Sequence, residues 1–199
     1  MDNQFKEEFL EIYEAFIERD GADKLLNYLS STDFFTAPAS TKFHLATECG
    51  LVQHSINVYK RLVRLMELEY GEDWEDKYPH ETVALVSLLH DVCKIGMYKV
   101  DYKNSKNENG VWEKVPFYKV EDDLPYGHGE KSVYIINGFL RLTREEAMAI
   151  NWHMGGFDDR AKGGSFVIAK AMEKYPLAVL LHLSDYMATY LDEKAADLH

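Results

Sequence analysis

Four residues of the types that bind metal ions stand among apolar residues in three separate segments of the chain. They are His54, the adjacent pair His90 and Asp91, and Asp185. Imidazole nitrogen and carboxylate oxygen are ligands for divalent ions such as Mn, Fe, Zn, Mg and Ni. Burying these groups without a partner is costly, and a bound cation offsets that cost. Metal sites in helical bundles are commonly built from facing helices, so the four residues predict a divalent metal centre.

A lysine follows the pair of His90 and Asp91 at helical spacing. Lys94 lies four residues after His90 and three after Asp91, so all three share one face if the helix continues. The lysine ammonium would then point at an anion held by the metal. The alternative is a lysine that ends the helix, where the helix dipole favours a cation.

Helices are the elements that would position these residues. Apolar residues recur at helical spacing from Phe5 to Ile17, and Gly21 ends that run. Thr143 and Glu146 form a capping box that begins a later helix. The other predicted helices span about 23–29, 51–68, 81–94, 131–139, 143–151, 166–174 and 177–191.

One segment has the alternation of a β-hairpin instead. Between Met97 and Val120, apolar and polar residues alternate on both sides of Asn-Glu-Asn-Gly. We expect strands at about 98–103 and 111–119, whose aromatic residues pack on the hairpin or the core. The less favoured alternative is that some of them, such as Trp112 and Tyr118, stack on a nucleobase. The predicted fold is therefore all-α, a compact helical bundle with one β-hairpin inserted at about 98–119.

Chain length indicates the number of domains, and net charge indicates the class of substrate. A chain of 199 residues, 46% of them hydrophobic, is expected to form one domain over 1–199. Its net charge of −12 disfavours a long nucleic acid and favours a small phosphorylated substrate in a metal-lined pocket. The apolar runs are shorter than the roughly 20 residues of a membrane span, and the acidic N-terminus is unlike a secretory signal. We therefore expect a cytoplasmic protein without a membrane partner.

Two cysteines, Cys49 and Cys93, are present. They are too few for a disulfide framework or for a cysteine-based zinc site. Both are expected to be small buried apolar residues. A role in the site is the less favoured alternative for Cys93, which follows Asp91 by two positions.

Three segments, GLVQHS, LLHDVCKIG and LLHLSDYMA, occur in this order along the chain. They resemble the three signatures of the HD-domain superfamily of metal-dependent phosphohydrolases. The resemblance covers about 38–192 as the HD core and leaves 1–30 as an N-terminal helical extension. It implies a helical core that places a His, a His-Asp pair and a distant Asp around a divalent metal. By this resemblance the ligands are His54, His90, Asp91 and Asp185.

The extended variant of this superfamily has two further histidines between the doublet and the last Asp, which complete a second metal position. His128 and His153 stand at suitable places for them. The resemblance therefore implies one or two divalent ions, whose identity among Mn, Fe, Mg, Zn and Ni the sequence leaves open. In HD phosphodiesterases with a His-Asp-x-x-Lys pattern, the lysine that matches Lys94 contacts the phosphate.

The stretch from Pro38 to His44, together with GLVQHS, also resembles a narrower group within the superfamily. It is similar to the corresponding part of bacterial HD nucleases, which trim nucleic acid from the 3′ end. Those nucleases carry paired histidines where this chain has Phe43 and His44. His44 is therefore either a substrate contact near the phosphate or a structural histidine.

Three residues near the later ligands are candidates for supporting roles. Trp152 and Arg160 are candidate substrate contacts, with core packing as the alternative for the tryptophan. Arg160 belongs to a glycine-flanked loop, about 155–164, that we expect to be a mobile rim of the site. His182 either orients Asp185 or packs beside the site.

These observations predict hydrolysis of a phosphate ester by water that the metal activates. Asp91 would bridge two ions, and Lys94 would stabilise the anion. The expected substrate is a nucleotide or another small phosphorylated molecule. Three alternatives stay open: a 3′-end nuclease, a di-iron oxygenase of the same superfamily, and a non-catalytic nucleotide-sensing module. Lys94 favours phosphate chemistry over oxygenation, and the sequence leaves the oligomeric state open.

Overall fold

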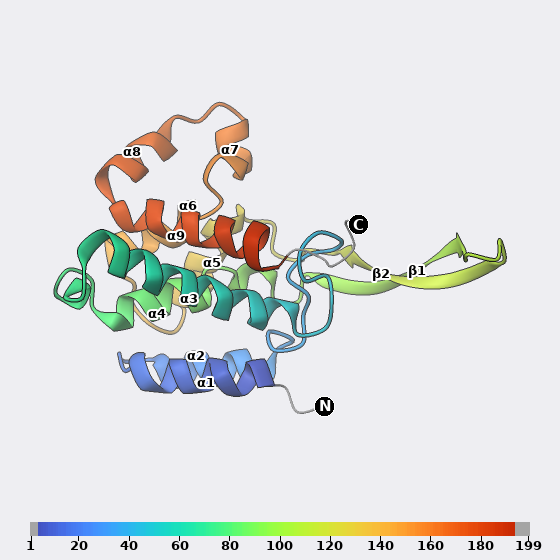
Figure 1. Ribbon diagram of the computed structural model, residues 1–199, viewed down its shortest axis with the longest axis horizontal. Helices are drawn as coiled ribbons and strands as arrows, with labels where there is room; N and C mark the ends of the chain where they lie inside the picture. The colour runs from blue at the N-terminus through green and yellow to red at the C-terminus, as the bar shows by residue number, and fades with distance from the viewer. Residues whose placement is uncertain (1–3, 194–199) are drawn as a thin grey trace.

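The structure is a computed structural model that describes residues 4–193 of the chain. Within this range the protein is mostly helical and has one two-stranded antiparallel sheet, as the sequence predicts. Figure 1 shows the helices packed against one another and the hairpin projecting away from them. Among the described residues, no helix is long and apolar enough to cross a membrane.

Five helices form the part of the bundle that carries the predicted ligands. Helix α3 packs against α4 and α9, α9 packs against α6, and α6 packs against α5. Helix α4 is central, because seven consecutive residues, Val83 to Leu89, are buried. A helix that is apolar on every side must be enclosed by others. The bounds are α3 (Gly50–Tyr70), α4 (His80–Leu89), α5 (His128–Asn137), α6 (Arg144–Trp152) and α9 (Pro176–Met187).

Helices α1 (Gln4–Phe16) and α2 (Ala22–Ser31) form a pair that lies against one side of the bundle (Figure 1). The core side of α1 buries Phe9, whose ring meets that of Phe34 edge to face at 5.2 Å. Gly21 joins the two helices with a φ of +93°, and a Cβ there would lie 1.9 Å from the carbonyl oxygen of Phe139. A glycine is therefore required at this turn.

The helix that carries His90 ends earlier than the sequence predicts. We expected one helix from 81 to 94, but α4 ends at Leu89, and a 3-10 turn, η2 (Val92–Lys94), follows. Nδ1 of His90 donates to the carbonyl oxygen of Ser87 at 2.8 Å and so satisfies a carbonyl at the helix end. Asp91 leaves the helical conformation with a φ of −107°.

The hairpin is longer and more exposed than expected. Strands β1 (Tyr98–Lys106) and β2 (Trp112–Val120) pair from Tyr98 opposite Val120 to Lys106 opposite Trp112. The sequence predicts aromatic packing here, yet Tyr102 is 62% exposed and Trp112 is 65% exposed. The hairpin of β1 and β2, hereafter the arm, therefore exposes aromatic side chains to solvent.

The segment expected as a mobile loop at 155–164 contains two short helical turns, η3 (Gly155–Phe157) and α7 (Asp159–Lys162). The carboxylate of Asp158 caps α7 by accepting the backbone N–H of Arg160 at 2.8 Å. Two further elements flank α9. Helix α8 (Val167–Lys174) precedes it, and a π-helical turn, η4 (Ala188–Asp192), follows it. Earlier in the chain, a short 3-10 helix, η1 (Trp74–Asp76), precedes α4.

Arg19 ties the N-terminal pair of helices to the bundle. It lies between α1 and α2, and its guanidinium binds Glu81 of α4 at 3.0 Å and Glu146 of α6 at 2.8 Å. The Glu146 side chain is fully buried, and it also caps α6 by accepting the backbone N–H of Thr143 at 2.7 Å. Because Glu146 also accepts the hydroxyl of Thr82 in α4 at 2.8 Å, this one buried carboxylate joins Arg19, α4 and α6.

We expect Arg19→Met to lower the free energy of unfolding by about 3–5 kcal/mol, because it leaves the charge of Glu146 buried without its partner. Denaturant unfolding measures this. Lys60→Met is the matched control, because it breaks an exposed pair with Glu8 and should cost at most about 1 kcal/mol. Equal effects of the two substitutions would contradict the role assigned to Arg19.

The effect should also depend on pH. Burial raises the pKa of Glu146, but hydrogen bonds from Arg19 and from Thr143 outweigh it and lower the pKa below the ordinary value of 4.5. A carboxylate with a depressed folded-state pKa stabilises the protein above its unfolded-state pKa and loses that contribution as the pH falls. The difference between wild type and Arg19→Met should therefore shrink below about pH 4.5.

Candidate metal centre

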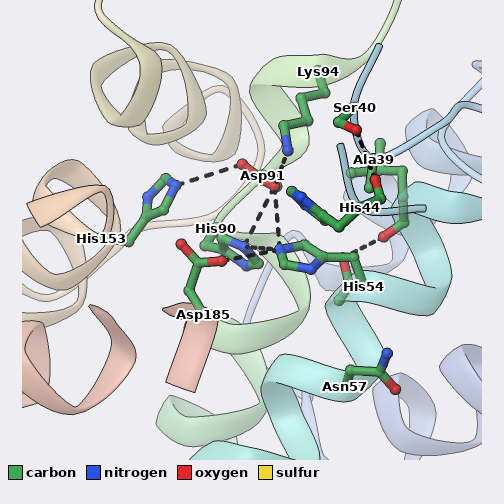
Figure 2. Close-up of polar contacts among 12 residues, drawn as sticks. Ala39, Ser40, His44, His54, Asn57, His90, Asp91, Lys94, His153 and Asp185 are labelled. Atoms are coloured by element: carbon green, nitrogen blue, oxygen red, sulfur yellow. Dashed lines mark hydrogen bonds and ion pairs between the residues drawn. The ribbon is translucent and has the colours of Figure 1, made fainter. Parts of the chain in front are cut away.

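Three helices bring His54, His90 and Asp185 to one point inside the bundle, and Figure 2 shows their side chains turned toward one another. His54 comes from α3, His90 from the end of α4, and Asp185 from α9. Nε2 of His54 lies 3.2 Å from Nε2 of His90 and 3.2 Å from Oδ1 of Asp185. The two histidines are buried, and the aspartate is half-buried.

Asp91 lies between this group and the two additional histidines. Its Oδ2 is 3.6 Å from Nε2 of His54 and 3.5 Å from Nε2 of His90. Its Oδ1 is 2.8 Å from Nε2 of His128, the first residue of α5, and 3.5 Å from Nε2 of His153, which follows α6. The six residues predicted as ligands therefore gather around one carboxylate, whose two oxygens face different pairs of histidines.

Hydrogen bonds from Nδ1 orient the rings of three histidines so that Nε2 of each faces the centre. Nδ1 of His90 and Nδ1 of His153 each donate to the carbonyl oxygen three residues earlier, that of Ser87 at 2.8 Å and that of Ile150 at 2.7 Å. A carbonyl oxygen only accepts, so the proton is on Nδ1 in both rings. Because both histidines directly follow a helix, each bond also satisfies a carbonyl at the helix end. Nδ1 of His54 donates to a carboxylate in the same way.

The donor set fits a divalent cation. Nε2 of His153 is fully buried and has no hydrogen-bond partner among the described residues, which is costly unless something else satisfies it. Donors that bind one ion at about 2.0–2.3 Å lie roughly 3–3.6 Å apart. The separations of 3.2 Å that join His54 to His90 and to Asp185 fall in this range. The residues would hold one cation on each side of Asp91.

Lys94 compensates the charge of Asp91. Its Nζ lies 2.6 Å from Oδ2 of Asp91, although the helix expected between the two residues is interrupted. Burial raises the pKa of Asp91, but Lys94 and His90 hold that pKa well below its usual range. The ammonium therefore lies beside the cluster, where the sequence predicts it.

The two innermost histidines have opposite proton affinities. Burial lowers the pKa of His54, but Glu193 and Asp185 outweigh it and raise the pKa to about 10. Burial lowers the pKa of His90 to about 3. An ion that binds Nε2 of His54 must displace a proton, so metal binding here releases protons.

Glu193 is a site residue that sequence reasoning missed. Both of its carboxylate oxygens lie 3.0 Å from Nδ1 of His54, and Asn57 donates to it at 2.9 Å. It follows the π-helical turn η4, and such turns often occur at functional sites. A carboxylate behind a metal-binding histidine fixes the ring and raises its basicity. No local pattern identifies Glu193, because it lies 139 residues from His54.

His44 and His182 lie at the edge of the cluster. The ring centroid of His44 is 5.0 Å from that of His54, burial lowers the pKa of His44 to about 4, and its Nε2 has no hydrogen-bond partner in the described residues. His182 donates from Nδ1 to the backbone carbonyl of His153 at 2.6 Å, so it supports that histidine. This position matches the alternative that His182 packs beside the site.

Trp152 and Arg160 have partners within the protein. The guanidinium carbon of Arg160 lies 4.0 Å from the ring centroid of Trp152, which is buried. The five N–H groups of Arg160 donate to Asp158, Glu130 and Asn151. Trp152 is therefore packed, as its alternative predicts, and the guanidinium of Arg160 is engaged within the protein. Contact of either residue with a substrate stays a prediction.

The two cysteines differ from each other. Cys49 is half-buried and precedes α3 with a φ of +63°, so the prediction that it is buried is wrong. Cys93 is buried as predicted, but its Sγ lies 3.5 Å from Nε2 of His128. Its surroundings are therefore those of the site as well as of the core.

Comparisons of this chain with family models, with curated proteins and with solved structures return no match. The chemistry of the centre is therefore the basis for assigning a function.

We expect Asp91→Asn to abolish metal binding, because an amide carries no charge and cannot bridge two cations. Thermal unfolding with added Mn²⁺ or Zn²⁺ measures this. An ion present at 100 times its dissociation constant should stabilise the wild type by about 2.7 kcal/mol and leave Asp91→Asn unaffected. The control is Asp159→Asn, which changes an almost fully exposed carboxylate. A metal-induced shift in Asp91→Asn equal to that of the control would show that the centre lies elsewhere.

We expect Glu193→Ala to weaken metal binding by about 10–100-fold, because His54 loses the carboxylate that orients it. Glu193→Gln should recover part of the loss, since the amide oxygen still accepts from Nδ1. Isothermal titration with Zn²⁺ gives the affinities. Asp192→Ala removes a neighbouring carboxylate that pairs with Arg61 at the surface, and it should leave the affinity unchanged. Equal Zn²⁺ affinities for all the variants and the wild type would show that Glu193 does not support metal binding.

Proposed function

We propose that this protein is a metal-dependent phosphohydrolase of the HD-domain type. The observation that carries the proposal is the placement of Asp91, whose two oxygens face two separate pairs of histidines while Lys94 contacts the same carboxylate. A pair of divalent ions bridged by a carboxylate, with a cation beside it, suits the hydrolysis of phosphate esters. The helical bundle and its buried metal-binding residues are compatible with the HD-type resemblance of the sequence.

Each side chain of the centre has a task in this reaction. Bound divalent ions would lower the pKa of a coordinated water and neutralise charge on the phosphoryl group. His54, His90 and Asp185 would hold one ion, and His128 and His153 would hold the other. Asp91 would bridge them and fix their separation. Lys94, next to Asp91, would donate from Nζ to a phosphoryl oxygen as negative charge develops.

The charge of the chain favours a small substrate. A net charge of −12 repels extended polyanions, whereas two bound cations and Lys94 make the centre locally positive. His44 stands beside His54, and burial holds its imidazole neutral at neutral pH, with a pKa of about 4. It can therefore offer a hydrogen bond to a substrate without adding charge. A nucleotide or another small phosphate ester is the proposed substrate class.

We expect Lys94→Ala to retain its metal and to lower kcat by about 100-fold, because one preorganised donor to the transition state is removed. A phosphate-release assay on a panel of nucleotides and phosphate esters with Mn²⁺ measures turnover, and elemental analysis measures metal content. Lys60→Ala, which changes an exposed lysine of α3, is the control. Turnover of Lys94→Ala equal to that of the control would show that Lys94 does not act on the substrate and would favour the alternative that it only ends a helix.

A second candidate function, cleavage of a nucleic-acid strand, is favoured by one observation on the hairpin. Opposed residues of paired strands lie on the same face, so Tyr102, Trp112, Lys106 and Lys114 share one face of the arm. Exposed aromatic rings and lysines are the groups that bind single strands, by stacking and by contact with phosphates. The residues of the hairpin, 98–120, include five lysines and three acidic residues in a chain of net charge −12.

The two substrates are distinguished by the paired substitution Lys106→Ala with Lys114→Ala. If a strand lies on the arm, cleavage of a single-stranded oligonucleotide should weaken, and the dependence of log K on log salt should flatten by about 0.7 for each phosphate that the arm no longer binds. Hydrolysis of a mononucleotide should not change. The control pair is Lys99→Ala with Lys119→Ala, on the opposite face. Equal oligonucleotide cleavage by both pairs would exclude the arm as a strand-binding surface.

A further inference from the structure

Cys93 stands where the second group of donors meets. Its Sγ lies 3.5 Å from Nε2 and 3.6 Å from Nδ1 of His128, and 4.0 Å from Oδ1 of Asp91. The side chain is 1% exposed. Its position is fixed, because the backbone N–H of Cys93 donates to the hydroxyl of Ser132 on α5 at 3.1 Å. The thiol is therefore held against the same two residues that face the second metal position.

We propose that the Cys93 thiolate is a ligand of the second metal position, beside Asp91, His128 and His153. The position then offers two nitrogens, one oxygen and one sulfur, and it selects a thiophilic ion such as Zn²⁺, Co²⁺ or Fe²⁺ over Mg²⁺. This inference rests on the metal centre of the proposed function and not on the reaction assigned to it.

Three donors of this position lie close enough together to share one ion. Sγ of Cys93 is 3.5 Å from Nε2 and 3.6 Å from Nδ1 of His128, so the thiol lies beside the imidazole ring. Oδ1 of Asp91 lies 2.8 Å from Nε2 of His128 and 4.0 Å from the sulfur. Donor atoms of Asp91, Cys93 and His128 thus lie within 4.8 Å of one another, a spacing that could hold a metal ion.

An independent observation also points to an ion at this position. Nε2 of His153 is buried without a hydrogen-bond partner among the described residues, and it lies 3.5 Å from Oδ1 of Asp91. Its ring centroid is 5.2 Å from that of His128. Because Nδ1 of His153 donates to a carbonyl, Nε2 carries the lone pair, and this nitrogen faces Oδ1 of Asp91. A cation bound there satisfies this nitrogen and the sulfur together.

The ligand set determines the metal preference. Mg²⁺ takes oxygen ligands and keeps several waters, whereas thiolate ligands favour zinc and the softer transition ions. On coordination the thiol releases its proton to solvent, one sulfur–metal bond forms, and no group changes oxidation state. The other position, with His54, His90 and Asp185, has no sulfur donor among the described residues. The two positions should therefore differ in metal preference.

The test is the absorption spectrum of the full-length protein titrated with Co²⁺. Thiolate bound to Co²⁺ gives an intense charge-transfer band in the near ultraviolet, while nitrogen and oxygen ligands give weaker visible bands. We expect the near-ultraviolet band in the wild type and in Cys49→Ser, which changes the other cysteine and is the matched control. Cys93→Ser should lose this band and keep visible bands from the remaining ligands.

Affinity gives a second readout. Cys93→Ser should lower the Zn²⁺ affinity of the second position by more than about 100-fold, beyond the roughly 10–100-fold effect of losing an outer partner of a ligand. Its Mg²⁺ affinity should be unchanged. Circular dichroism and thermal unfolding of the metal-free protein show whether Cys93→Ser is folded, and Cys93→Ala serves as a second variant.

The possible outcomes separate this inference from the proposed function. A near-ultraviolet band that persists in Cys93→Ser and Cys93→Ala, or a wild type that binds Co²⁺ without the band, would overturn the role of Cys93. Failure of the wild type to bind Co²⁺ would overturn the metal centre as a whole. Absence of phosphate release from every ester, with the charge-transfer band present, would overturn the hydrolase and leave the ligand assignment intact.

Discussion

The carboxylate of Asp91 is a negative charge enclosed near the middle of a helical bundle, and the surrounding elements are arranged to compensate it. A buried charge without partners is costly. Helix α4 ends directly before His90, and Asp91 leaves the helical conformation. The 3-10 turn that follows places Nζ of Lys94 next to Oδ2 of Asp91. Helix α3 contributes His54, and α5 begins with His128 at Oδ1. The end of α4 and the start of α5 therefore both lie next to the carboxylate of Asp91.

Helix termini hold two histidine rings of the centre in a fixed orientation. His90 and His153 each follow the last residue of a helix and donate from Nδ1 to the carbonyl three residues earlier. One hydrogen bond therefore satisfies a carbonyl that the helix leaves unpaired and also orients Nε2 toward the cluster. His54, within a helix, has no free carbonyl beside it and uses the carboxylate of Glu193 instead. Both solutions present the same nitrogen to a metal.

The outer parts of the molecule have different kinds of support. Helices α1 and α2 are joined to the bundle through Arg19 and the buried carboxylate of Glu146, which gives them a defined position. The hairpin has no comparable cover, and its aromatic residues Tyr102 and Trp112 remain exposed. A two-stranded hairpin is at best marginally stable by itself in water, so a surface of this kind suits contact with a ligand. Under the two proposed functions, a small phosphate ester would bind at the centre, and a nucleic-acid strand would extend from the centre along the arm.

The sequence by itself determined the helical class and most helix positions, because apolar periodicity is a local property of the chain. The capping box at Thr143 is confirmed for the same reason. The sequence also proposed six ligands, from residue type and from the HD-type resemblance, and the structure brings these six residues together. Only the tertiary structure decided that Glu193 supports His54, that Cys93 lies beside His128, and that Arg160 is saturated by internal hydrogen bonds. These contacts depend on the rotation and depth of packed helices. Spacing along a helix specifies which face a residue occupies, but the residues on the opposing face come from distant parts of the chain.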